Sequence, residues 1–134
     1  MRPVVVETSA LIAILIEEAS AESLLLEIQN DEVRLCPANC AVEAMVVLVR
    51  KGRTTAELAH LQILALLQSL EILIIPLDER AMKFALDGYS RFGKGSGKSP
   101  AVLNFGDCLS YGVAKAASGK LLYTGDDFAN TDLV

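Results

Sequence analysis

The hydrophobic residues of this chain fall into short, β-branched runs that alternate with longer stretches of helical periodicity. Short apolar runs are typical of buried strands, whereas apolar residues that recur at positions i, i+3 and i+4 are typical of helices packed on a sheet. The predicted strands cover residues 4–6, 33–36, 71–75 and 121–124. The predicted helices cover residues 10–16, 21–29, 39–50, 54–70, 79–92 and 105–117. This alternation predicts a three-layer α/β fold with a mainly parallel central sheet flanked by helices.

Local signals mark where several of these elements begin. Thr54 and Glu57 have the spacing of a capping box, so a long helix should begin there. Asn104 has a side chain that can cap the helix beginning at Phe105. The strand at residues 71–75 is apolar throughout after its first residue, so we expect it to be buried on both faces.

The length and composition of the chain suit one globular domain. A chain of 134 residues can bury a core of its own, which predicts a single domain over residues 1–134. The most apolar region, residues 61–77, is interrupted by Gln62, Gln68 and Glu71, so it has no run of the roughly 18 apolar residues that span a bilayer. The first residues do not have the pattern of a signal peptide. We therefore expect a soluble, cytoplasmic protein without a membrane partner.

The three cysteines, Cys36, Cys40 and Cys108, lie among apolar or small residues. An odd number of cysteines in such surroundings favours reduced thiols over a disulfide framework. A zinc site at Cys36 and Cys40 would need further ligands, and the only histidine, His60, is predicted to lie in the middle of a helix. The same histidine gives no support to a Ser-His-Asp triad.

The formal net charge of −5 argues against a sequence-independent nucleic-acid binder, because such proteins normally carry a strong basic excess. The charge does not exclude an acidic nuclease. Carboxylates that bind a metal contribute negative charge, and the metal and a few local cations can then hold phosphate.

Several acids are predicted near the carboxyl ends of the strands, where open parallel sheets bind their ligands. Glu7 follows the first strand directly, and Asp126 and Asp127 follow the last one. Asp107 lies in the first turn of a helix, and Glu43 lies early in the helix after the second strand. Carboxylates that converge on one edge repel each other unless a cation lies between them. Magnesium, which prefers hard oxygen ligands and retains several waters, is the natural candidate.

Each of these acids also has a purely structural explanation. Asp107 can stabilise the N-terminus of its helix, and Asp126 with Asp127 can form a turn. The spacing of the acids alone is therefore weak support for a metal site.

Three sequence motifs resemble those of the PIN-domain family, and in particular the VapC toxins of VapBC toxin–antitoxin pairs. Residues 4–11 read VVVETSAL, similar to the family's opening, in which an apolar strand runs into Asp-Thr-Ser-Ala. Residues 104–111 read NFGDCLSY, similar to the third-acid motif, and residues 121–128 read LLYTGDDF, similar to the closing motif. Glu43 falls where the family has its second acid. The motifs occur in the family's order and span nearly the whole chain.

The resemblance implies roles for particular side chains. The implied catalytic acids are Glu7, Glu43, Asp107 and Asp126. The implied metal ligands are drawn from Glu7, Asp107, Asp126 and Asp127. The Thr-x-Asp spacing selects Asp126 as the fourth acid and the Asp-Phe pair selects Asp127; we prefer Asp126. Thr8 and Ser9 would hold the carboxylates by hydrogen bonds, although both can also act as helix caps.

The resemblance further implies a PIN fold and an endoribonuclease that cleaves RNA with water activated by Mg²⁺, for which Mn²⁺ can substitute. It also implies a homodimer that is silenced by a cognate VapB-like antitoxin. The chain departs from the family pattern at Glu7, where the family has Asp. A catalytically weakened or dead PIN-like binding module is therefore an alternative hypothesis.

Two other interpretations fit the sequence less well. Residues 93–99 read GKGSGKS, which is one residue too short for a P-loop, and they follow a helix instead of a strand. A receiver-type signalling domain needs a phosphoacceptor Asp at the end of a central strand. Here the strand at residues 71–75 is followed by Pro76, and Asp107 begins a helix.

Overall fold

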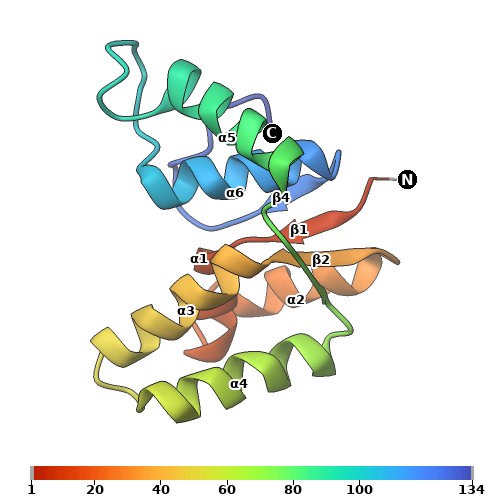
Figure 1. Ribbon diagram of the computed structural model, residues 1–134. Coiled ribbons are helices and arrows are strands. Elements are labelled where there is room, and N and C mark those ends of the chain that lie inside the picture. The colour runs from red at the N-terminus through yellow and green to blue at the C-terminus, as the bar shows by residue number, and fades with distance from the viewer. Residues whose placement is uncertain (1, 134) are drawn as a thin grey trace.

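The computed structural model describes residues 2–133, and four strands in it form a parallel sheet with the order β3-β2-β1-β4. The strands are β1 (Val4–Val6), β2 (Arg34–Pro37), β3 (Leu73–Ile75) and β4 (Lys120–Leu122). The helices are α1 (Thr8–Leu15), α2 (Ala21–Asn30), α3 (Ala38–Arg50), α4 (Ala56–Ser69), α5 (Glu79–Phe92) and α6 (Phe105–Ala116). Helices lie on both faces of the sheet, which confirms the predicted three-layer α/β class (Figure 1).

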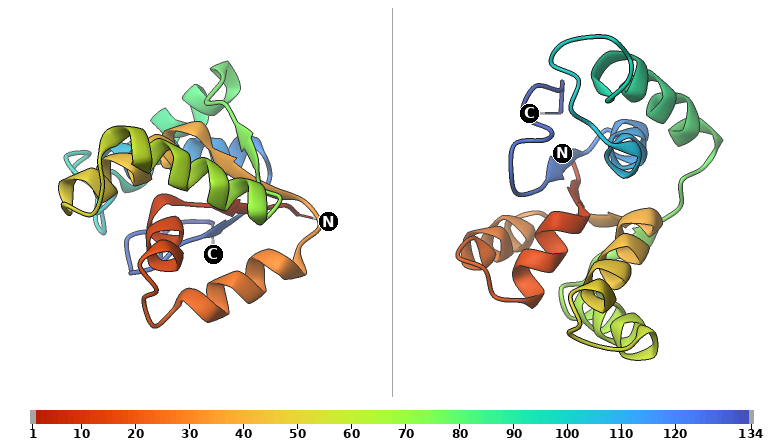
Figure 2. Two further views of the ribbon diagram at one scale, coloured as in Figure 1. Left: turned by 90° about the horizontal axis from the view of Figure 1, so that it is seen from below. Right: turned by 90° about the vertical axis from the view of Figure 1, so that its left-hand side faces the viewer.

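The central strand β1 shows how the pleat divides the core between the two faces of the sheet. Val4 and Val6 point into a cluster with α1 to α4, whereas Val5 points into a second cluster with α6 and the C-terminal segment. Helix α5 packs against α6 (Figure 2). All three valines are fully buried, so their β-branched side chains pack on both sides.

The prediction that residues 71–75 form a fully buried strand is wrong. Leu73 is 65% exposed and Ile74 is 40% exposed, although Ile72 just before the strand is buried. The reason is that β3 is the edge strand of the sheet and pairs with β2 alone. An apolar run predicts a strand, but the run does not indicate how many neighbours that strand will have.

Two predicted helix caps have different outcomes. The helix α4 is capped by Thr55, whose hydroxyl accepts a hydrogen bond from Leu58 N at 3.3 Å, so the predicted capping box at Thr54 is wrong. The predicted cap at Asn104 is confirmed, and Asp107 completes a capping box with it. Asp107 N donates to Asn104 Oδ1 at 2.8 Å, and Asn104 N donates to Asp107 Oδ2 at 3.1 Å.

The segment that follows β4 is held against α6 by a polar cluster. Tyr111 donates a hydrogen bond from its hydroxyl to Asp132 Oδ1 at 2.8 Å, and Lys115 Nζ lies 3.0 Å from Asp132 Oδ2. Phe128, which is 2% exposed, packs its ring on Tyr123 at a centroid distance of 5.1 Å. These contacts fix the path of the chain around Asp126 and Asp127.

Two further sequence predictions are tested by the described residues. Cys36, Cys40 and Cys108 are buried and unpaired, which confirms the expectation of free thiols. Within residues 2–133, none of the helices has both the length and the apolar character needed to cross a membrane.

Candidate active site

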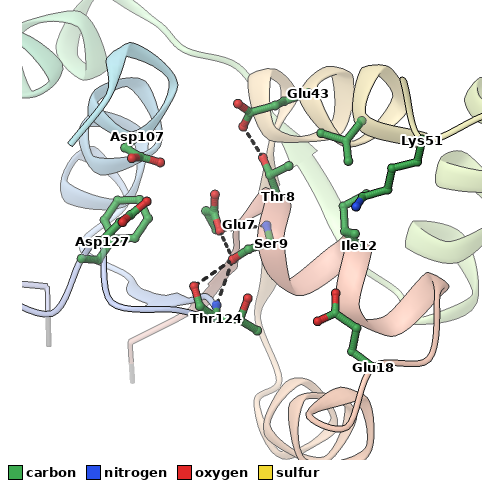
Figure 3. A pocket seen from close by; sticks show the side chains of 12 residues that line it. Glu7, Thr8, Ser9, Ile12, Glu18, Glu43, Lys51, Asp107, Thr124 and Asp127 are labelled. Carbon is green, nitrogen blue, oxygen red and sulfur yellow. Dashed lines mark hydrogen bonds between the residues drawn. The ribbon is translucent and has the colours of Figure 1, made fainter. Parts of the chain in front are cut away.

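A cavity of about 300 Å³ lies beyond the carboxyl ends of β1 and β4. Side chains from α1, α3, α6 and the segment after β4 line it (Figure 3). Four of the acids named from the sequence are among them: Glu7, Glu43, Asp107 and Asp127. The fold therefore brings together acids that are 100 residues apart in the sequence, because parallel strands end at the same edge.

Glu7 is held at the start of α1, where it serves as the N-cap. The Glu7 side chain is 4% exposed, and its Oε1 accepts a hydrogen bond from Ser9 N at 2.9 Å and another from the Ser9 hydroxyl. The same hydroxyl accepts a hydrogen bond from Thr124 N at 2.9 Å. Ser9 therefore connects the end of β4 to the Glu7 carboxylate and holds that carboxylate at the cavity wall.

Glu43 reaches the cavity from α3, where it is half-buried. Thr8 donates a hydrogen bond from its hydroxyl to Glu43 Oε1 at 2.7 Å. On the other side Gly106 leaves the room that Glu43 occupies, because a Cβ at position 106 would lie 2.9 Å from Glu43 Oε2. Thr8 and Gly106 thus position the Glu43 carboxylate from two different helices.

Asp107 is the third residue of α6, lines the cavity and is 8% exposed. Because only Oδ2 accepts the capping hydrogen bond from Asn104 N, the second oxygen has no protein donor within the described residues. The structural explanation for Asp107, a helix cap, therefore holds for one oxygen and leaves the other for the cavity.

The geometry places Asp127, and not Asp126, at the cavity, contrary to the preference drawn from the Thr-x-Asp spacing. Gly125 turns the chain after β4 with a φ of +82°, a conformation that glycine adopts without strain. Phe128 is then buried at the cavity wall. With the turn and the buried ring fixed, Asp127 lies beside Asp107 at the cavity (Figure 3), whereas Asp126 does not line it.

Two of the acids at the cavity, Glu7 and Asp107, have raised pKa values. Burial raises the pKa of Glu7 to about 7, against the lowering effect of the two Ser9 hydrogen bonds, and the charges of Asp107 and Glu43 raise it further. Burial also raises the pKa of Asp107 to about 6, and Asp127 and Glu43 add to the effect. Both shifts arise chiefly from burial, and the neighbouring carboxylates contribute the smaller part.

Comparison with known proteins identifies the family. The family model described as PIN domain matches residues 4–133. The chain belongs to the PIN domain family. The ribonuclease VapC28 of Mycobacterium tuberculosis is 38% identical over 127 residues, a match that covers 95% of this chain and 92% of that protein. A VapC ribonuclease of Rhizobium meliloti is 32% identical over 139 residues, covering 96% of this chain and 97% of the relative.

The PIN fold itself is supported by a solved structure. The crystal structure of Mycobacterium tuberculosis VapC20, a toxin that cleaves the sarcin-ricin loop, superposes with a TM-score of 0.72. The match covers 98% of this chain and 96% of that one at 15% sequence identity, so it shows a shared fold. Membership of the PIN family also removes the receiver-domain interpretation.

The PIN domain's donor set has the chemistry of a hard-cation site. Carboxylate oxygens are the ligands that magnesium and manganese prefer, and a cation beside the buried carboxyl groups of Glu7 and Asp107 would favour their ionised forms. Within residues 2–133, however, no three His, Cys, Asp or Glu side chains are placed to hold one ion by direct bonds. The donor atoms therefore fit a hard cation in their chemistry, and part of its coordination would have to come from water.

Two residues of the PIN domain site were not singled out from the sequence as functional. Lys51 lines the cavity, but in the sequence it reads as a cation that suits the end of α3. Gly106 contacts Glu43, and its only sequence signal is its place within the NFGD motif. Both roles depend on contacts between α3 and other helices, which periodicity does not reveal.

Proposed function

We propose that this PIN domain is a metal-dependent endoribonuclease and the toxin of a toxin–antitoxin pair. The observation that carries the proposal is the group of four carboxylates around one cavity, two of them buried with raised pKa values. The ribonuclease activity named in the VapC relatives supports the same conclusion.

Glu7, Asp107 and Asp127 are the residues that would hold a Mg²⁺ or Mn²⁺ ion, in part through water, because no three acids of residues 2–133 are placed to bind one ion directly. The chemistry supplied by such an ion is the activation of water and the neutralisation of charge on the phosphate oxygens. Ser9 would keep Glu7 oriented, and the capping hydrogen bond from Asn104 would keep Asp107 oriented. In this proposal Asp127 replaces Asp126 as the fourth acid, because Asp127 alone of the two lines the cavity.

Glu43 would act on the other side of the reacting phosphate. Its Oε1 is held by the Thr8 hydroxyl, and its Oε2 lies beside Gly106. A carboxylate fixed in this way can orient the attacking water and accept its proton. No protein nucleophile is needed for this reaction.

The test is cleavage of a mixed RNA substrate by the wild type and by Asp107→Asn, with and without EDTA. The amide oxygen of Asn can still accept the hydrogen bond from Asn104 N, so the variant should fold. We expect its activity to fall by much more than tenfold, since each tenfold is about 1.4 kcal/mol of transition-state stabilisation. Retention of more than a tenth of the wild-type rate, or full cleavage in EDTA, would contradict the proposal.

A weakened or inactive PIN-like binding module is the second candidate, and Glu7 is the observation that favours it. The longer side chain folds back onto Ser9 at the start of its own helix, and a shorter Asp would place its carboxylate differently. Binding of RNA without metal-dependent cleavage by the wild type would support this candidate.

The proposed partners of the toxin are a VapB-like antitoxin and a second copy of this chain. Large apolar side chains are exposed on α4 and on α5, and among them Leu61 is 60% and Leu86 is 69% exposed. An apolar groove of about 650 Å³ also lies between α5 and the start of α6. Contiguous apolar surface is typical of proteins that bind partners. Light scattering on the purified protein tests the dimer, and co-purification with the product of an adjacent gene tests the antitoxin.

A further inference from the structure

One face of α3 and its C-cap residue runs from the acids of the cavity to a lysine, Lys51. Glu43, Val47 and Lys51 are spaced at i, i+4 and i+8, and all three line the cavity. At a rise of 1.5 Å per residue, Lys51 lies about 12 Å along the axis from Glu43. Helical side chains lean toward the N-terminus of their helix, which for Lys51 is the direction of the acids. Figure 3 shows the Lys51 side chain extending from α3 toward Ile12 of α1.

The charge around Lys51 leaves its ammonium group available for a ligand. Within residues 2–133, Lys51 is the only basic residue that lines the cavity, and its ammonium group makes no ion pair. Glu18 lines the same end of the cavity, yet the two side chains form no salt bridge. The cavity is otherwise dominated by carboxylates, so a polyanion entering it meets a favourable side chain at this one place.

We propose that Lys51 binds a phosphate of the RNA further along the strand from the one that is cleaved. The inference rests on the proposed ribonuclease function and adds the path that the RNA strand follows from the cleaved phosphate. The cleaved phosphate lies among Glu7, Asp107 and Asp127, and the chain of phosphates continues along α3 to Lys51. Lys51 thereby fixes the position of the RNA strand. This contribution affects RNA binding and leaves the chemical step unchanged.

The kinetic test compares Lys51→Gln with Lys83→Gln, which removes the same charge from an exposed position on α5 outside the cavity. For Lys51→Gln we expect KM for a mixed RNA to rise roughly three- to tenfold at low salt, with kcat unchanged. Lys51→Arg should restore KM, and Lys83→Gln should leave it unchanged. Glu18→Gln, which removes a repelling carboxylate at the same end, should lower KM. A wild-type KM in Lys51→Gln, or an equal rise in Lys83→Gln, overturns the inference.

A binding measurement separates this inference from the proposed function. Fluorescence anisotropy with a labelled, single-stranded RNA of mixed sequence is carried out on Asp107→Asn, with and without Lys51→Gln, over a range of salt. Loss of one phosphate contact should reduce the slope of log K against log salt by about 0.7 for a single strand. An unchanged slope overturns the role of Lys51 whether or not the wild type cleaves RNA. A reduced slope supports the role of Lys51. Absence of cleavage by the wild type would refute only the proposed ribonuclease function.

Discussion

Replacing Glu7 with Gln should stabilise the metal-free protein at alkaline pH and have almost no effect at acidic pH. Glu7 is 4% exposed, and its pKa rises from 4.5 to about 7 on folding, first because of burial and then because of nearby carboxylates. The folded state therefore binds the Glu7 proton more tightly than the unfolded state does. The stability from this group is fully present below about pH 4.5 and is lost as the pH rises through about 7.

The size of the effect follows from the two pKa values. At about 1.4 kcal/mol per pH unit, the difference between 4.5 and about 7 is worth up to about 3 kcal/mol. The Gln side chain is neutral at every pH and retains an oxygen that can accept the hydrogen bond from Ser9 N. For a domain of this size, a gain of that order raises the Tm by on the order of 10 °C.

The assay is thermal unfolding of both proteins in EDTA at about pH 4.5 and about pH 8, the two sides of the predicted transition. Glu27→Gln, at an exposed position on α2, is the matched control and should behave like the wild type at both values. Addition of Mg²⁺ at the higher pH should raise the Tm of the wild type more than that of Glu7→Gln, since only the folded wild type has the full set of ligands. If the Tm difference between Glu7→Gln and the wild type is the same at both pH values, the argument from burial is refuted.

Four further variants test the site. Asp127→Asn should lose at least tenfold in metal-dependent RNA cleavage while Asp126→Asn stays near the wild type, and the opposite order would restore the preference for Asp126. Gly106→Ala should leave the Tm within a few degrees, because the added Cβ crowds the carboxylate end of Glu43 and makes an ordinary 3.5 Å contact with Asn104 Oδ1, yet it should lower kcat by displacing the Glu43 carboxylate. Glu7→Asp should increase cleavage in a magnesium titration, since magnesium demands near-ideal geometry that the longer acid meets imperfectly. Equal activity of wild type and Glu7→Asp at every concentration would show that Glu7 is a competent ligand.

Much of the fold can be predicted from the sequence because it depends on local signals. The change from β-branched runs to helical periodicity locates all four strands and six helices of the described residues to within a few positions. The cap at Asn104 is equally local, since the hydrogen bonds with Asp107 span only three residues. Glu7 could be placed at the cavity for the same reason, because it directly follows β1.

Other features depend on which segments meet in space. The apolar run of β3 predicts a strand whether that strand lies at the centre of the sheet or at its edge. Only the strand order shows that β3 is an edge strand and that Leu73 is exposed. Similarly, Thr54 and Thr55 both offer a capping hydroxyl, and the path of the chain into α4 selects Thr55.

The sequence by itself determined that acids would gather at one edge of a parallel sheet, because Glu7, Asp107 and Asp127 lie next to the ends of elements and Glu43 lies in the second turn of α3. Only the tertiary structure decided that Asp127 faces the cavity, because the turn at Gly125 and the burial of Phe128 set the direction of its side chain. Only the tertiary structure brought Lys51 to the other end of that cavity, because its neighbours there come from α1 and the loop after it. Adjacency along the chain is encoded locally, whereas the direction of a side chain into a shared cavity depends on packing between distant segments.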